Sequence, residues 1–153
     1  MAENEPLPNG ADTQPQVGLL AQYVKDLSFE NPNAPVCYQW QDAPQIDVQF
    51  NIGSQSVGDD VYEVVLKTEA KATVNDKTAF QVELLYAGLF GIRNVPEEQI
   101  QGFLLAEAPR LLFPFARRVI ADTTRDGNFP PLMLEPIDFA ALYDQNKANL
   151  KRN

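Results

Sequence analysis

The sequence contains no histidine, the side chain that most often serves as a general base or binds a metal ion. Only three serines are present, and none lies in the pattern of a nucleophile elbow. Gly88 and Gly91 lack both the lysine of a phosphate-binding loop and the glycine spacing of a dinucleotide-binding turn. These absences predict a protein without a catalytic centre, a metal site or a cofactor.

Cysteine and long apolar runs are also scarce. Cys37 is the only cysteine, so a disulfide within the chain is impossible, which agrees with a reducing compartment. The apolar runs are too short to span a bilayer, and residues 1–15 have neither the basic nor the apolar region of a signal peptide. We therefore expect a disordered tail over residues 1–15, a cytoplasmic location and no direct insertion into a membrane.

The length of 153 residues fits one domain, which we place at residues 16–149, followed by a C-terminal tail at 150–153. The net charge of −9 is concentrated in residues 1–62, which carry nine acidic residues and one lysine. An acidic surface repels phosphate groups, so we expect no nucleic acid partner. A basic protein partner fits the charge, and so does a role in solubility alone.

Three segments have the alternating pattern of β-strands, namely residues 45–52, 61–74 and 78–92, and residues 18–30 are predicted to be an edge strand with mixed faces. Residues 53–60 are rich in Gly, Ser and Asp and are predicted to be a loop, and residues 75–77 are predicted to be a hairpin turn. The strands place most of their apolar side chains on one side. The pattern predicts an antiparallel sheet with one apolar face and one mostly polar face.

A long helix is predicted over residues 96–126 to cover the apolar face. Pro96 and the acids Glu97 and Glu98 suit its first turn, and Pro109 and Pro114 predict a bend or a break inside it. The side chains expected to face the sheet recur at helical spacing: Ile100, Phe103, Leu104, Leu111, Leu112, Phe115 and Val119.

Residues 128–137, NFPPLMLEPI, are interrupted by three prolines and cannot form a helix. They nevertheless carry five large apolar side chains, which is too many for an idle loop. Asp138 is a suitable cap for a short final helix that begins at Phe139.

Three stretches of the chain resemble the SecB family of bacterial protein-export chaperones. They are YVKDLSFENPNAP at 23–35, DDVYEVVLKTEAKA at 59–72, and LLFPFARRVIADTTRDGNFPPLMLEPIDFAALY at 111–143. The resemblance implies an α+β fold, in which a four-stranded antiparallel sheet carries a long and a short helix packed on one face. It also implies a homotetramer built as a dimer of dimers.

The function implied by the resemblance is to bind unfolded precursor proteins without nucleotide and to deliver them to the SecA ATPase. The segment at 128–137 would then wall a hydrophobic groove for these clients. The groove residues implied are Trp40, Phe129, Leu132, Leu134, Phe139, Leu142 and Tyr143. The residues implied to dock SecA are Asp26, Glu30 and Glu83.

Two positions depart from the family pattern. Gln81 stands where many family members have an apolar residue, and the basic ending NKANLKRN stands where many have an acidic tail that makes a second contact with SecA. Two alternatives also stay open. One is a small-molecule enzyme that uses a buried acid of raised pKa, such as Glu107. The other is a SecB-like chaperone that serves antitoxin or stress clients.

Overall fold

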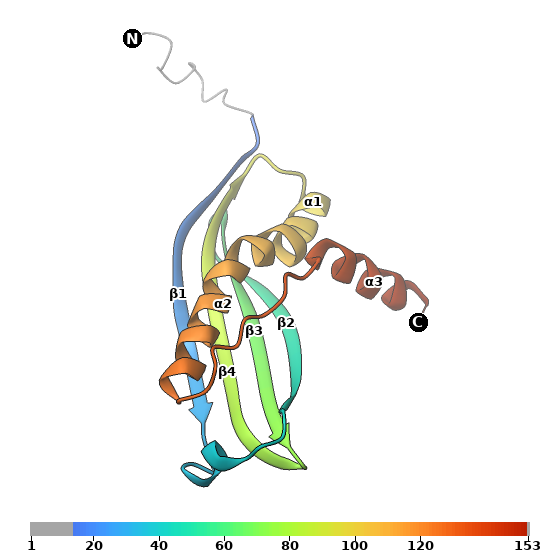
Figure 1. Cartoon of the computed structure of the whole chain (residues 1–153). Helices are drawn as coiled ribbons and strands as arrows, with labels where there is room; N and C mark the ends of the chain where they lie inside the picture. Colours follow the sequence, from blue (N-terminus) through green and yellow to red (C-terminus); the bar gives the residue numbers. More distant parts are fainter. Residues whose placement is uncertain (1–13, 153) are drawn as a thin grey trace.

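The computed structural model describes residues 14–152, with side chains up to residue 146. Residues 1–13, most of the predicted tail, lie outside this range. Four strands of the described chain form one sheet in the order β1-β4-β3-β2, and every neighbouring pair is antiparallel (Figure 1). Their bounds are β1 Gln16–Glu30, β2 Gln45–Gly58, β3 Val61–Val74 and β4 Lys77–Arg93. The α+β fold is therefore confirmed.

β3 and β4 are the two central strands of the sheet. They supply most of the core side chains, because each of them lies between two other strands. Alternate side chains along them are buried, as the sequence predicts, among them Leu66, Val82 and Phe90. The turn between these strands is formed by Asn75 and Asp76, which both have a positive φ, as a two-residue hairpin requires.

The prediction of a loop at residues 53–60 was wrong for most of its length. β2 continues to Gly58, because Gly53, Ser54 and Gln55 pair with consecutive residues of β3. Small polar residues weaken a strand, but here the long, regular neighbour supplies a continuous set of hydrogen-bonding partners.

The predicted long helix consists of three successive segments, α1 Glu97–Gly102, the π-helix η4 Phe103–Glu107 and α2 Ala108–Asp126. The π-helix ends just before Pro109, whose missing N–H and bulky ring disfavour regular α-helical bonding to the preceding turn. The predicted break is thus found at Pro109, whereas Pro114 lies inside α2.

The helix face expected to cover the sheet was partly wrong beyond the π-helix. Leu112 is fully buried, as predicted, but Leu111 and Phe115 are each 38% exposed, and the other buried positions include Ala116 and Ile120. A π-helical turn contains an additional residue, which rotates the following face by one position. In place of Leu111, Phe115 and Val119, the sheet therefore receives Leu112, Ala116 and Ile120.

A segment without regular structure, which we call the crossover (residues 127–138), leads from α2 to α3 (Phe139–Arg152). It runs back across the sheet alongside α2 before α3 projects beyond the β2 edge (Figure 1). The backbone N–H of Ala141 donates to Asp138 Oδ1 at 3.0 Å, which confirms the predicted cap. The helix continues past residue 149, and the division into a domain and two tails stays a prediction.

None of the helices within residues 14–152 has the length and apolar character needed to cross a membrane.

Candidate functional site

Three hollows follow one another along β2 and form what we call the β2 groove. The first lies between the aromatic residues Trp40, Phe80 and Phe129, and it shares Ile46 and Leu132 with the second. The second lies between β2 and the crossover residues 132–137. The third lies between β2, the π-helix and α3, and it shares Phe50 with the second. The shared residues make these hollows neighbours along one mainly apolar path.

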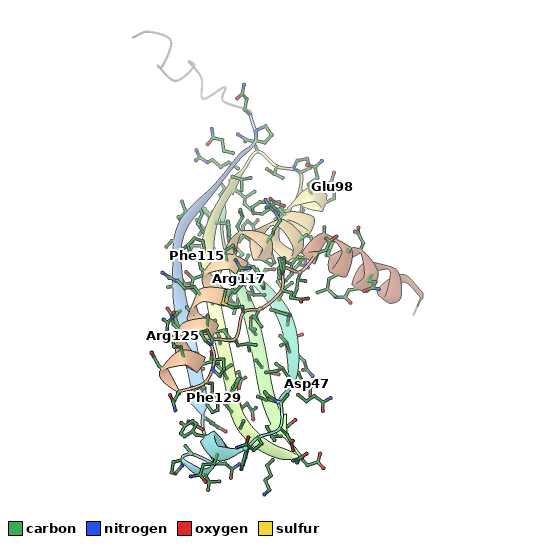
Figure 2. All side chains as sticks on the ribbon, in the orientation of Figure 1. Asp47, Glu98, Phe115, Arg117, Arg125 and Phe129 are labelled. Atoms are coloured by element: carbon green, nitrogen blue, oxygen red, sulfur yellow. The ribbon has the colours of Figure 1, made fainter. Side chains whose placement is uncertain are left out.

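The first hollow is the most aromatic part of the path. The ring centroids of Phe80 and Phe129 are 4.9 Å apart, and those of Tyr38 and Phe129 are 5.5 Å apart. The Tyr38 hydroxyl donates to the Gly127 carbonyl oxygen at 2.9 Å, so the start of the crossover is attached to the segment before β2. Figure 2 shows Phe129 close to this segment. The aromatic wall is thereby held in place from two sides.

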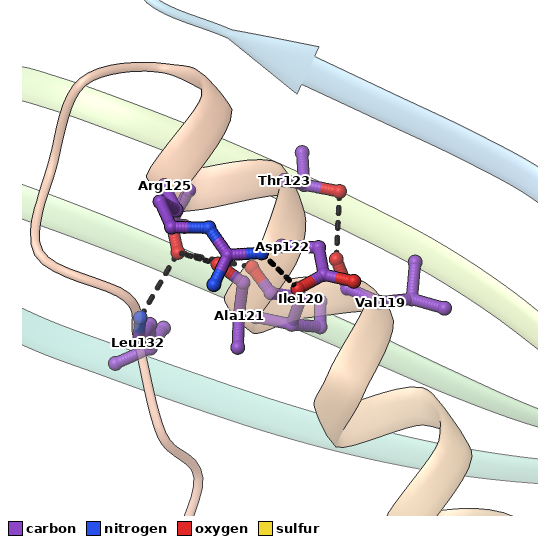
Figure 3. Close-up of polar contacts among 8 residues, drawn as sticks. Val119, Ile120, Ala121, Asp122, Thr123, Arg125 and Leu132 are labelled. Atoms are coloured by element: carbon purple, nitrogen blue, oxygen red, sulfur yellow. Dashed lines mark hydrogen bonds and ion pairs between the residues drawn. The ribbon is translucent and has the colours of Figure 1, made fainter.

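Thr124 of α2 fastens the crossover to the helix. Its fully buried hydroxyl accepts the backbone N–H of Leu132 at 2.9 Å and lies 3.0 Å from the Ile120 carbonyl oxygen, to which it can donate (Figure 3). The hydroxyl of the neighbouring Thr123 donates within the helix, to the Val119 carbonyl oxygen at 2.7 Å (Figure 3). Because Leu132 lines two hollows, Thr124 sets the position of the groove wall.

Most residues predicted for the groove line the path. Trp40, Phe129 and Leu132 line the first hollow, Leu132 and Leu134 the second, and Leu142 and Tyr143 the third. Phe139 is the exception, because it is 2% exposed and packs in the core against Phe50 and Phe113.

Sequence reasoning missed the contribution of β2 itself. The long helix was expected to cover the apolar face of the sheet, yet Ile46 and Val48 on that face are each 36% exposed and line the groove. The alternation identified their face correctly. It did not reveal that β2 is an edge strand that α2 leaves partly uncovered.

The opposite face of the sheet, which we call the outer face, gathers the predicted docking acids. In β1 the partners of Asp26, Ser28 and Glu30 are Leu85, Glu83 and Gln81 of β4. Directly paired residues point to the same side of a sheet, so Glu83 lies between Asp26 and Glu30 on that face. The structure thus brings the three predicted acids together.

Two bulges in β1 make this arrangement possible. Leu20 and Lys25 have no partner in β4. After each of these unpaired residues the alternation along β1 shifts by one position, so odd-numbered and even-numbered residues exchange faces. Beyond the second bulge, Asp26 and Glu30 share the outer face, whereas Leu27 and Phe29 pair with the core residues Leu84 and Val82.

Glu63 is a buried carboxylate on the outer face, the face that the sequence predicts to be mostly polar. It accepts bonds from Lys25 Nζ at 2.8 Å, Tyr23 Oη at 2.5 Å and Gln55 Nε2 at 3.1 Å. The hydrogen bonds from Lys25 and Tyr23 lower the pKa of Glu63, and the bond to Glu63 raises the pKa of Tyr23 to about 12. This network ties β1, β2 and β3 together across β4.

Lys67 lies among the outer-face acids. Its Nζ is 3.1 Å from Glu83 Oε1 and 3.2 Å from Glu69 Oε1, and these bonds raise the pKa of Lys67. Glu69 and Glu83 are directly paired across β3 and β4, so the ammonium separates two like charges.

The carboxylate chemistry required by the enzyme alternative is not found at Glu107. The hydrogen bond from Arg110 lowers the pKa of this residue, where a general acid would need a raised one. No group of three or more possible ligands within residues 14–152 is arranged to hold a metal ion.

Comparison with known proteins adds a family relationship. Residues 10–150 match the family described as preprotein translocase subunit SecB. Protein-export protein SecB of Rhizorhabdus wittichii is 73% identical over 91% of this chain and 84% of its own length. The protein of the same name in Sphingopyxis alaskensis is 65% identical over 90% of this chain and 80% of its own length.

A solved structure has the same fold. It is the SecB-like chaperone Rv1957 of Mycobacterium tuberculosis in complex with a ChAD peptide from the antitoxin HigA1. The TM-score is 0.67 at 16% identity, and the match covers 79% of this chain and 90% of the other.

Proposed function

Because this chain belongs to the SecB family, whose members are protein-export chaperones and not enzymes, we propose that it holds unfolded precursor proteins in the β2 groove and delivers them to SecA. The observation that carries the proposal is the row of neighbouring, mainly apolar hollows beside an edge strand. The stretch from Ile46 to Ile52, which lines these hollows, would accompany about 20 Å of extended chain.

The groove suits an unfolded client for two physical reasons. Its side chains are aromatic and aliphatic, so they accept many apolar sequences without demanding one geometry. Its wall is stiffened by Pro130, Pro131 and Pro136 and fixed by Thr124, so little conformational entropy is lost on the chaperone side when a client binds. Folded proteins hide the segments that the groove binds, and selection for unfolded clients therefore needs no nucleotide.

The edge of β2 supplies a second kind of contact. β2 lies at the end of the sheet and has β3 on one side only. Its free backbone groups can pair with an extended client strand, while the hollows receive alternate side chains of that strand. Backbone pairing is independent of sequence, which fits a chaperone with many clients.

SecA docks on the outer face, at Asp26, Glu30 and Glu83. The support for this assignment is that the three acids lie together, away from the groove, on a chain of net charge −9. A client and the motor would then occupy opposite sides of the sheet.

The working form is a homotetramer, a dimer of dimers. Exposed apolar side chains on β1 and α2 support this assembly because water would otherwise cover them. This β1–α2 surface contains Val17, Leu19, Val24, Leu27, Leu111 and Phe115. Several copies also bring several grooves to one client, which raises the effective affinity.

The chaperone acts in the cytoplasm, before its clients cross the membrane. Export clients are favoured over antitoxin clients, because relatives at 65% and 73% identity are protein-export proteins, whereas the antitoxin-bound structure shares only the fold.

The test measures two affinities on one set of variants, without nucleotide. A fluorescently labelled, denatured secretory precursor reports client binding, and purified SecA reports docking. Ile46→Asp with Leu132→Asp is expected to weaken client binding by about tenfold or more, since it places charges in the apolar path. Asp26→Lys, Glu30→Lys and Glu83→Lys together are expected to weaken SecA binding by a similar factor and leave the client affinity unchanged.

Matched controls exclude general effects of charge. Val57→Asp adds an acid at an exposed apolar position of β2 that lines none of the three hollows. Replacement of Glu97, Glu98 and Asp126 by lysine makes the same change in net charge on the side of the sheet that carries the helices. Client binding that survives the groove variant, or SecA binding that falls equally in both reversal variants, would refute the corresponding half of the proposal.

A further inference from the structure

We propose that Lys67 is a built-in competitor for the docking acids, which lowers the affinity of the outer face for a cationic partner and keeps docking reversible. This inference rests on the proposed docking of SecA at Asp26, Glu30 and Glu83. Lys67 is not among the residues for which the family resemblance implied a role.

The ion pairs of Lys67 support this competitor role. In the free protein its ammonium group is within 3.2 Å of oxygens of both Glu83 and Glu69. A cation of the partner that binds Glu83 must take the place of this ammonium or share the carboxylate with it. Docking therefore exchanges one ion pair for another, and the gain is smaller than it would be at an unpaired acid.

The pairing of strands explains why a lysine is placed there. Glu69 and Glu83 are direct partners on β3 and β4, and two like charges in this position destabilise a sheet. Lys67 relieves the repulsion while the protein is free, and a cationic partner would relieve it when bound. The two acids can thus stay together without an obligatory partner.

The side chains are exposed enough for exchange. Lys67 is 36% exposed and Glu83 is 41% exposed at the side chain. By contrast, the Glu63 carboxylate is only 8% exposed at the side chain and is held by three donors, so the neighbouring network is a fixed element and no competitor for a partner.

The experiment compares Lys67→Gln with Lys71→Gln. Lys71 lies on the same face of β3 and its removal changes the net charge equally, but it takes part in no ion pair of the described residues. Binding of purified SecA is measured by calorimetry at low salt. Lys67→Gln is expected to bind about three- to tenfold more tightly than the wild type, with a much smaller change for Lys71→Gln.

A thermal melt of each variant distinguishes an effect of Lys67 on SecA binding from an effect on the stability of the fold. Lys67→Gln leaves Glu69 and Glu83 in repulsion, so its melting temperature is expected to fall while its affinity rises. The double variant Lys67→Gln, Glu83→Gln is expected to lose the gain in affinity, because the freed carboxylate is its source.

The outcomes distinguish this inference from the docking proposal. If Lys67→Gln and Lys71→Gln tighten binding equally, only net charge matters, and the competitor role is refuted. If Lys67→Gln does not tighten binding although Glu83→Gln weakens it, docking stands and the competitor role is refuted. If Glu83→Gln leaves SecA binding unchanged, the docking site itself is wrong and the role of Lys67 falls with it.

Discussion

Glu63 determines how the outer face responds to pH. Its pKa lies below the usual value of 4.5 because Lys25 and Tyr23 donate to the ionised form. The stability that it contributes is fully present above pH 4.5 and is lost as the pH falls through the lowered pKa. The raised pKa of Tyr23 acts at the other extreme, since its contribution is complete below pH 10.0 and is lost as the pH rises toward about 12.

Glu63→Gln is predicted to remove the part of the loss of stability at acidic pH that Glu63 causes. Urea unfolding would be measured between about pH 3 and pH 7, and the free energy of unfolding of the wild type should fall more steeply below pH 4.5 than that of the variant. Glu135→Gln, an exposed crossover position, should keep the wild-type slope. Equal slopes for the wild type and Glu63→Gln would show that Glu63 carries no such linkage.

Strand alternation placed Glu63 on the correct face, but its burial could not be predicted. Two of its three donors, Tyr23 and Lys25, come from β1, and Lys25 reaches it from a bulge. A bulge depends on the pairing of two strands, so neither strand reveals it alone.

At the level of elements, the crossover depends on its attachment to α2. Thr124→Val keeps the shape of the side chain but removes the acceptor of the Leu132 N–H, and should lower the free energy of unfolding by about 1–3 kcal/mol. The affinity for an unfolded client should fall as well, because the groove wall is no longer fixed.

Thr123→Val is the matched control, since it removes a hydroxyl one position away that donates within the helix, to the Val119 carbonyl oxygen. Chemical denaturation gives the stability of both variants, and binding of the labelled precursor gives their affinity. If Thr123→Val and Thr124→Val reduce client affinity equally, the bond to Leu132 has no special role in the groove.

The elements differ in how far the sequence predicts them. β3, β4 and their hairpin were predicted almost to the residue, because alternation and turn chemistry are local properties. The extension of β2 and the rotated face of α2 were missed. The first depends on a neighbouring strand, and the second on the π-helix before Pro109.

For the whole molecule, the β1–α2 surface is predicted to hold copies together. Val24→Asp places a charge on this surface, and light scattering during chromatography should show smaller species, with a dissociation constant raised about a hundredfold or more. Val57→Asp makes the same change at nearly equal exposure, 48% against 45%, on the opposite edge strand. Assembly unchanged by Val24→Asp would place the contact between copies elsewhere.

The candidate site shows the same division between local and global information. The family resemblance implied Trp40 and Leu132 for the groove and three acids for docking, and the structure places these two sets in separate regions. The edge position of β2 and the ion pairs of Lys67 follow from strand order and register, which no single stretch of sequence specifies.

The two bulges of β1 also determine where this segment can change in length during evolution. Loss of Leu20 or Lys25 would leave each remaining residue of β1 opposite its present partner in β4, so both faces would keep their side chains. Loss of a paired residue such as Ser28 would instead turn the residues on one side of it to the opposite face, exchanging apolar positions such as Phe29 with acidic ones such as Glu30. In descendants of this gene, changes in the length of β1 should therefore occur at the bulges and not at paired positions.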